Sequence, residues 1–257
     1  MVQNEILFID RTTRRPLVLA DGSYITHEKA NTIIRRVDKT KQEQSKRRKK
    51  KAEVFTPSWL CNDMINLLED ENKLKSMSFE EYISLTFLEI ACGEAPFLVS
   101  RYDATTGDLI DINNRIGLLD RKLRIVNENT TNEKDWFKWT LRTYQSIYGY
   151  EFQGDSLFIA RINLLQTFID YLDFKWHRKP TDKELKTITN VISWNIWQMD
   201  GLTGCVPYTN ISCKIMDWKN NKTVLFRELK GGDIECMSHS ELKLKVNELQ
   251  EKNKKGI

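Results

Sequence analysis

The sequence has few of the residues that bind metals or form disulfides. It contains three histidines and five cysteines among 257 residues, and all of them are widely spaced. Neither set has the paired spacing of zinc ligands, and an odd number of scattered cysteines favours reduced thiols over a disulfide framework. The residues therefore predict no metal site and no disulfide-stapled scaffold.

Long apolar runs are also absent. No stretch approaches the length that a membrane-spanning helix needs, and the first residues, Met-Val-Gln-Asn-Glu, lack the basic start and apolar centre of a signal peptide. We therefore expect a cytoplasmic protein with no membrane partner. A content of 40% hydrophobic and 10% aromatic residues is enough for one sizeable core, or one core with a small appendage.

Positive charge is concentrated in one segment, although the net charge is only +4. The run consists of six consecutive basic residues: Lys46, Arg47, Arg48, Lys49, Lys50 and Lys51. It is either a solvated linker or a clamp for nucleic-acid phosphates, and composition alone leaves both interpretations open. The run has no aromatic residue, so it does not predict a base-stacking platform.

Three apolar runs end on acidic residues and predict the strands of an α/β sheet. Residues 86–91 contain Glu89, residues 146–151 end at Glu151, and residues 191–199 precede Asp200. Helices are expected after the first two, over 97–102 and from about Leu157 to Leu172, and another over 181–189. Such strands are typical of a doubly wound sheet, in which ligands bind at the carboxyl ends of the strands.

The remaining segments are predicted from turn residues and apolar spacing. The first 34 residues predict two short strands, Ile6–Ile9 and Pro16–Ala20, then a helix from about His27. Thr56 and Pro57 predict a capped helix start. Residues 104–145 read as an insertion with one helix, which must leave the sheet core. Strands are expected over 211–218 and 223–229, and a charged helix over 238–254.

The turn after the first strand, Ala91-Cys92-Gly93-Glu94-Ala95, is the most informative motif. Its small residues allow a ligand to approach the backbone closely, although it has one glycine where a dinucleotide fingerprint has three. Cys92 is better explained as a small packing residue than as a nucleophile.

Three segments together carry a resemblance to a known family. They are Phe55-Thr56-Pro57, the run Leu88 to Leu98, and Ile147-Tyr148-Gly149-Tyr150-Glu151 followed by Ala160-Arg161-Ile162-Asn163. Over about residues 52–202 the chain is similar to the adenine-specific DNA methyltransferases of restriction-modification systems. The resemblance implies a Rossmann-like S-adenosylmethionine domain and DNA as a partner.

The resemblance also implies roles for individual residues. Phe55, Thr56 and Pro57 would lie against the methionine end of S-adenosylmethionine, and the turn that follows Glu89, with Ala91, Cys92 and Gly93, would wrap around the cofactor. Glu151 would hold the ribose hydroxyls, and Asp200 the adenine amino group. From the residues alone, Glu151 is otherwise an exposed strand-end acid, and Asp200 otherwise belongs to an Asp-Gly turn.

The chain departs from the family at the catalytic tetrapeptide, an Asn, Asp or Ser followed by two prolines and an aromatic residue. The nearest run, Cys205-Val206-Pro207-Tyr208, lacks the polar acceptor and reads as a loop. We therefore name no catalytic residue. The chain is expected to be a DNA adenine-N6 methyltransferase of a restriction-modification type system, or its cofactor-binding portion, completed by a partner subunit or by an absent C-terminal region. The alternatives are an inactive methyltransferase-like module that binds nucleic acid or protein and, less attractively, a small-molecule methyltransferase.

The expected organisation has three parts. Residues 1–51 form an N-terminal hairpin and basic segment, residues 52–230 a methyltransferase-like domain with the 104–145 insertion, and residues 231–257 a charged C-terminal helix.

Overall fold

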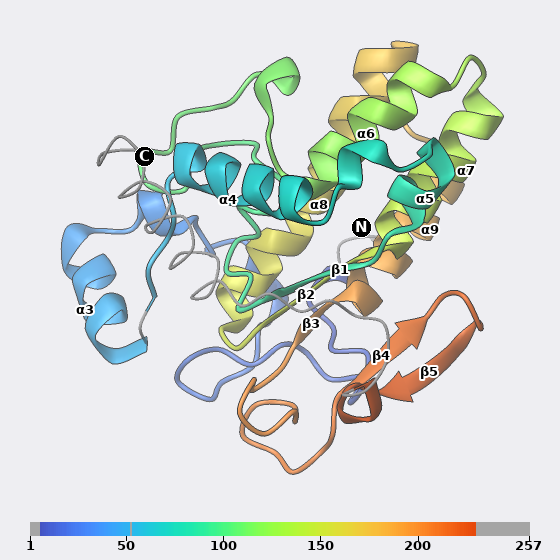
Figure 1. The fold of residues 1–257 in the computed structure, drawn as a ribbon. Helices are drawn as coiled ribbons and strands as arrows, with labels where there is room; N and C mark the ends of the chain where they lie inside the picture. The colour runs from blue at the N-terminus through green and yellow to red at the C-terminus, as the bar shows by residue number, and fades with distance from the viewer. Residues whose placement is uncertain (1–5, 52, 230–257) are drawn as a thin grey trace.

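Three short parallel strands lie at the centre of the structure, a computed structural model that describes residues 6–51 and 53–229 (Figure 1). They are β1 (Phe87–Ile90), β2 (Ile147–Glu151) and β3 (Ile196–Gln198), in the order β1-β2-β3. Phe87 pairs with Ile147, and Gly149 pairs with Ile196. The prediction of an α/β fold with strands at these segments is confirmed, although each strand is shorter than expected.

Helices and a hairpin cover the sheet. The helices are α2 (His27–Ala30), α3 (Lys41–Lys51), α4 (Ser58–Glu71), α5 (Phe79–Ser84), α6 (Leu118–Asn129), α7 (Glu133–Gln145), α8 (Gly154–Trp176) and α9 (Asp182–Asn195). Short 3-10 turns are η1 (Arg36–Asp38), η2 (Leu74–Ser76), η3 (Ile112–Asn114) and η4 (Phe226–Leu229). An antiparallel hairpin, β4 (Lys214–Asp217) and β5 (Lys222–Leu225), lies below the strands in Figure 1, and α4 to α7 lie above them.

Alternate residues of the strands face these two layers, as the pleat of a strand requires. Phe87, Ile147 and Ile196 belong to the main core on the helical side. Their neighbours along the strands, Leu88, Tyr148 and Trp197, belong to a second cluster with residues of the hairpin segment. Because both faces are covered, the strands are apolar almost throughout.

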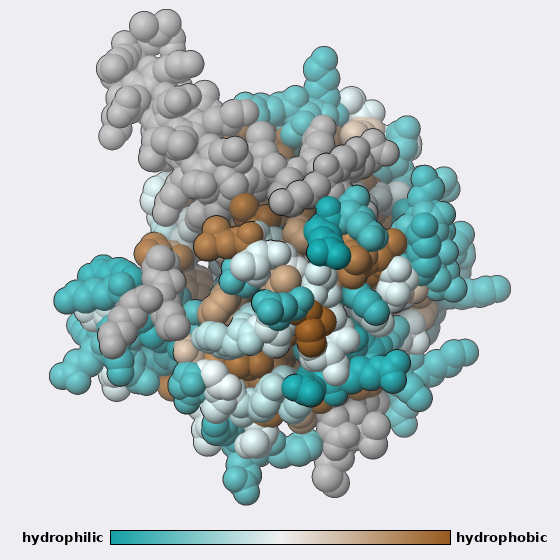
Figure 2. All heavy atoms as spheres, turned by 90° about the horizontal axis from the view of Figure 1, so that it is seen from below, coloured by the Kyte–Doolittle hydropathy of each residue, from teal (hydrophilic) through white to brown (hydrophobic). Residues whose placement is uncertain are grey.

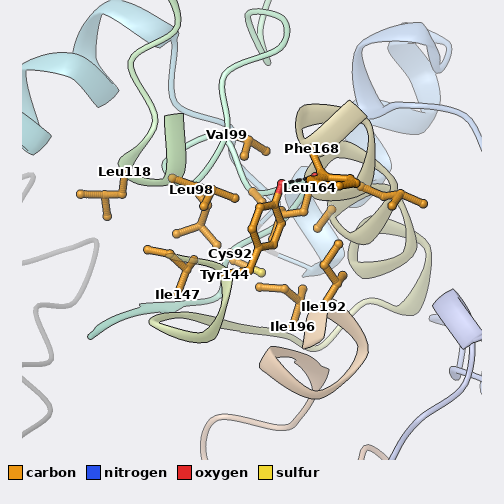
Figure 3. Packing of buried hydrophobic residues seen from close by; sticks show 14 of the residues in the cluster. Cys92, Leu98, Val99, Leu118, Tyr144, Ile147, Leu164, Phe168, Ile192 and Ile196 are labelled. Carbon is orange, nitrogen blue, oxygen red and sulfur yellow. Dashed lines mark hydrogen bonds between the residues drawn. The ribbon is translucent and has the colours of Figure 1, made fainter. Parts of the chain in front are cut away.

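Helix α8 runs through the main core. Figure 3 shows Leu164 and Phe168 of this helix beside Tyr144 of α7, with Ile147 of β2 in the same cluster. The Tyr144 hydroxyl donates a 2.8 Å hydrogen bond to the Leu164 carbonyl, which gives the one polar atom of that buried ring a partner.

Residues 104–145 do not leave the sheet core, contrary to the expectation for an insertion. Helices α6 and α7 contribute Leu119, Leu123 and Trp136 to the main core, and all three side chains are fully buried. The Trp136 indole nitrogen donates to Asn127 Oδ1 at 2.6 Å, which joins the two helices. Both helices also bury polar residues, among them Asp120, Lys122 and Thr140, which explains why the segment reads as hydrophilic although it belongs to the core.

The helix predicted over 97–102 is absent, because the backbone there has another role. The carbonyls of Phe97 and Leu98 accept hydrogen bonds from the Leu118 and Leu119 amides at 2.8 and 2.9 Å. These carbonyls therefore cap the start of α6, as a helix N-terminus requires. The first long helix after β1 thus begins at Leu118.

Two other predictions need correction. The N-terminal strands are only isolated bridges, Ile9 with Pro16 and Val18 with Tyr24, and the predicted helix near His27 is the short α2. The third strand was predicted from Val191, but α9 continues to Asn195 because Ile188, Val191 and Ile192 form its buried face. The two strands expected after residue 210 are confirmed as β4 and β5, and the helix predicted over 238–254 lies outside the described residues.

Strand β1 has an unpaired edge within the described part of the chain. The Phe87 amide donates to the Ser146 carbonyl at 2.9 Å, so the parallel ladder directs the backbone groups of Phe87 and Glu89 toward β2. Those of Leu88 and Ile90 point to the other side, where residues 6–51 and 53–229 provide no strand. The expectation of a doubly wound sheet is therefore not met there, since the strand order does not reverse.

None of the helices in the described segments combines the length and apolar character needed to cross a bilayer. Seen from below, hydrophobic side chains lie in separate patches among hydrophilic ones (Figure 2).

Candidate cofactor site

A cavity of about 280 Å³ lies at the carboxyl ends of β1 and β2. Seven of the nine predicted cofactor residues line it, and Pro57 and Asp200 do not. The lining residues are Glu53, Val54, Phe55, Thr56, Glu89, Ala91, Cys92, Gly93, Pro96, Phe97, Glu151, Gln153 and Ser156. Residues far apart in the sequence are thus brought together at the sheet edge where α/β folds bind ligands.

The turn after β1 has an unusual backbone conformation. Ala91, Gly93 and Ala95 have φ values of 55°, 57° and 66°, in the left-handed region. This conformation is strained for the two alanines and suits only the glycine. A Cβ atom at Gly93 would also lie 3.2 Å from the Phe55 ring, so the turn and the Phe55 segment are in close contact.

Side chains from α8 and from the turn itself hold this conformation. Asn163 on α8 donates to the Glu94 carbonyl at 3.0 Å and to the Tyr102 hydroxyl at 3.1 Å. The Tyr102 hydroxyl donates in turn to Glu94 Oε2 at 2.7 Å. The resemblance included Asn163 without giving it a role, and in the structure it positions the turn after β1.

Glu151 is a wall of the cavity rather than an exposed strand-end acid, since only 9% of its surface is accessible. Burial raises the pKa of its carboxyl, although backbone amides oppose the shift. Its two oxygens accept hydrogen bonds from the amides of Gln153, at 2.8 Å, and Gly93, at 2.9 Å. Each carboxylate oxygen has a further acceptor site, so Glu151 can still bind ligand hydroxyls.

Glu89 lines the same cavity, and no cation among the described residues pairs with its carboxyl group. Burial raises the pKa of the Glu89 carboxyl well above its usual value, and the nearby Glu151 raises it further. Glu89 Oε2, Gln153 Oε1 and Ser156 Oγ are buried without a hydrogen-bond partner among the described residues. Such unmet polar atoms are costly unless a ligand or water satisfies them.

The Phe55-Thr56-Pro57 segment forms the third wall. Phe55 and Thr56 line the cavity, whereas Pro57 does not. Pro57 is the residue that immediately precedes α4. Contrary to the prediction, the side chain of Thr56 does not cap α4. The carboxylate of Asp103 accepts hydrogen bonds from the Ser58 amide at 2.7 Å and its hydroxyl at 2.6 Å.

Part of the basic segment folds onto this site. Arg47 pairs with Glu53 and, at 2.8 Å, with Asp155, and Lys39 pairs with Asp155 at 2.9 Å. The Arg36 guanidinium lies 5.2 Å from the centre of the Phe55 ring. Burial opposes ionisation of Asp155, but Lys39 and Arg47 hold its pKa below the usual value. Arg47 is therefore engaged by carboxylates of the protein itself, a contact that neither the linker nor the phosphate-clamp interpretation of the run included.

The other basic residues of α3 are arranged differently. Lys46, Arg48 and Lys49 are exposed, and the side chains of Lys50 and Lys51 lie outside the described part. The segment is thus a helix docked by one arginine, with cations on its outer surface.

The acidic residues at this site differ in whether a cation pairs with them. Glu53 and Asp155 have cationic partners, whereas Glu89 and Glu151 form no ion pair with any described residue. Two buried carboxyl groups without a cation favour a ligand that brings positive charge.

Asp200 lies outside this cavity, in the Asp-Gly turn that was its alternative assignment. Its carboxylate accepts a 2.9 Å hydrogen bond from the Leu202 amide. It lines a separate depression with Phe152 and Tyr208, whose rings meet edge to face at 5.5 Å. Residues 205–208 form a loop, as expected.

Four cysteines lie in the described part of the chain, and Cys92 is the one of them that lines the cavity. Cys61, Cys92, Cys205 and Cys213 are free cysteines. Cys92 is 1% exposed, and burial raises its pKa well above the usual value, so it packs against the sheet rather than acting as a nucleophile. Within residues 6–51 and 53–229, no group of histidine, cysteine and acidic side chains is arranged to hold a metal.

Sequence reasoning missed Glu53, Gln153 and Ser156, which also line the cavity. Their positions in the sequence could have indicated them. Glu53 lies two residues before Phe55, and Gln153 and Ser156 follow Glu151 at the start of α8. A scan against models of protein families, a search of curated proteins and a search of solved structures each find no match to this chain.

Proposed function

We propose that the chain binds S-adenosylmethionine and belongs to a DNA adenine-N6 methyltransferase of Rossmann-like fold. The observation that supports this most is the pair Glu89 and Glu151, which face one cavity without a cation. S-adenosylmethionine carries a sulfonium and an ammonium group, either of which compensates a buried carboxylate. Glu151 supplies acceptors for the ribose, and the strained turn around Gly93 allows close approach to the ligand.

We further propose that the chain is the cofactor-binding portion of such an enzyme. No run in the sequence supplies the acceptors and aromatic face that a flipped adenine needs. The unpaired edge of β1 adjoins the cavity. In a doubly wound sheet the ligand binds where the strand order reverses, so that position has a strand on each side. A strand of another polypeptide added to this edge would complete the site and bring the missing base-binding residues.

Calorimetric titration with S-adenosylmethionine tests the cofactor proposal. Glu151→Ala removes two charge-assisted hydrogen bonds to the ribose, each worth about 1.5–3 kcal/mol, so we expect affinity to fall about 100-fold or more. Glu80→Ala, which removes an exposed carboxylate on α5, is the matched control and should bind normally. Absence of binding to the unaltered chain would refute the proposal.

The alternative is an inactive methyltransferase-like module that binds nucleic acid or protein, and the missing tetrapeptide favours it. Transfer of a labelled methyl group to unmethylated DNA, with and without added candidate subunits, separates the two. Cofactor binding without transfer under any of these conditions would support the module.

The outer surface of α3 is proposed to contact DNA phosphates. Converting Lys46, Arg48 and Lys49 to glutamine should reduce the slope of log affinity against log salt by about 0.9 for each phosphate that the variant no longer neutralises. Converting the exposed Lys134, Lys183 and Lys186 to glutamine changes the net charge equally and should leave the slope unchanged. Equal slopes for both triple variants would make α3 a solvated linker.

A further inference from the structure

A second, larger groove of about 510 Å³ lies between α4, η2–α5 and α6. It shares no lining residue with the cofactor cavity. Three arginines and three asparagines are among its residues: Arg115, Arg121, Arg124, Asn62, Asn66 and Asn129.

Arg121 fixes the orientation of two of these amides. Its Nη2 donates to Asn62 Oδ1 and Asn66 Oδ1, both at 2.9 Å. Because each amide oxygen is bound to the guanidinium, each Nδ2 group is free to donate elsewhere, and neither donates to a described residue. The pair is therefore presented as hydrogen-bond donors.

The other two arginines have unused donors. Arg115 is 7% exposed, and its Nη2 pairs with Asp170 at 2.7 Å, but its buried Nη1 has no hydrogen-bond partner among the described residues. Arg124 donates from Nη2 to the carbonyls of Asn113 and Arg115, at 3.2 and 2.6 Å.

Glu69, the one acidic residue among the described residues that line the groove, is already neutralised. Glu69 pairs with Arg121 and accepts a 2.7 Å hydrogen bond from the Tyr82 hydroxyl. Positive charge therefore exceeds negative charge in the groove. An arginine with an unmet buried donor next to fixed amide donors suits an anion with several oxygens.

The groove also has an apolar side. It is formed by Leu74, Met77, Phe79, Ile116 and Ile125. We propose that the groove binds a phosphate-bearing ligand of nucleotide size, with the phosphate at Arg115, Arg124 and the two asparagine amides and the body on the apolar side. The volume is within the usual range for small-ligand sites, about 300–1,000 Å³.

Calorimetry with inorganic phosphate, thymidine monophosphate and thymidine tests this inference. Thymidine avoids the adenine that the cofactor cavity is proposed to accept. We expect thymidine monophosphate to bind most tightly, phosphate more weakly and thymidine at least tenfold more weakly than its monophosphate. A 5′-phosphorylated oligothymidine distinguishes the source: tighter binding than the monophosphate indicates nucleic acid, and weaker binding a free nucleotide.

Two variants locate the site. Arg124→Gln removes a donor, and Asn66→Asp keeps the acceptor for Arg121 while placing a negative charge in the groove. Each should weaken binding of the monophosphate at least tenfold with an unchanged melting temperature, and Arg48→Gln on α3 should bind normally. Equal binding by all three variants, or none by the unaltered chain at millimolar concentration, would overturn the inference.

Discussion

Replacing Arg161 with alanine is expected to lower the free energy of unfolding by about 3–5 kcal/mol. The side chain is fully buried in α8. Its Nε donates to the Ile196 carbonyl at 2.7 Å, Nη1 to Leu7 and Ile9 at 2.8 and 2.9 Å, and Nη2 to Ser193 at 3.0 Å. One guanidinium thus joins the N-terminal segment to the end of α9 and the start of β3.

Alanine would leave a cavity and remove the donor of three buried carbonyls and of the partly buried Ile9 carbonyl. Each buried carbonyl costs about 1–3 kcal/mol when unsatisfied. Burial lowers the pKa of Arg161 to about 10, so relief of the buried charge offsets part of this loss. Arg161→Lys keeps a charge but cannot reach carbonyls on several sides, and an intermediate loss is expected.

Urea unfolding followed by circular dichroism measures these differences. Arg178→Ala is the control, because Arg178 is also paired, with Glu133 and Glu184, but is 28% exposed. Surface pairs contribute about 0–1 kcal/mol. A loss at Arg161 no greater than that at Arg178 would show that the N-terminal segment is not anchored as described.

Patterns over short stretches of sequence were sufficient to predict the helices and strands that depend on residues close together along the chain. The apolar runs of β1 and β2 and the spacing along α8 reflect burial, which leaves a direct trace in the sequence. The region after Gly93 was predicted wrongly as a helix for the same reason. Phe97 and Leu98 are apolar because they pack beneath α6, and their carbonyls are bound by a helix that starts 20 residues later.

The candidate site shows the same limit. Glu89, Gly93 and Glu151 were predicted because each lies at the end of a strand, where topology alone brings them together. The pairing of Arg47 with Glu53 and Asp155 depends on how α3 packs against the start of α8. The sequence of the basic run does not indicate which of its residues makes this contact. The capping of Ser58 by Asp103, 45 residues away, is likewise a tertiary contact.

At neutral pH, Glu89→Gln is expected to stabilise the ligand-free protein while weakening its binding of S-adenosylmethionine. Burial raises the pKa of Glu89 in the folded protein well above 4.5, its ordinary value, which applies to the unfolded chain. At pH values between the unfolded-state pKa and the folded-state pKa, the folded protein therefore binds more protons than the unfolded chain. Stability therefore falls as pH rises through that window. Glutamine removes the charge, and relief of about 1–2 kcal/mol should raise the melting temperature by about 2–6 °C.

Binding should have the opposite pH dependence. A cationic ligand favours the ionised carboxylate, so affinity for S-adenosylmethionine should rise with pH, by up to about tenfold per unit, until Glu89 is ionised in the free protein. S-adenosylhomocysteine has no sulfonium charge and serves as the matched ligand, for which the rise should be smaller. In Glu89→Gln the difference between the pH profiles of the two ligands should disappear, because the remaining pH dependence comes from Glu151, which has a raised pKa and lines the cavity for both. If the unaltered protein binds the two ligands with the same pH profile, Glu89 does not face the sulfonium.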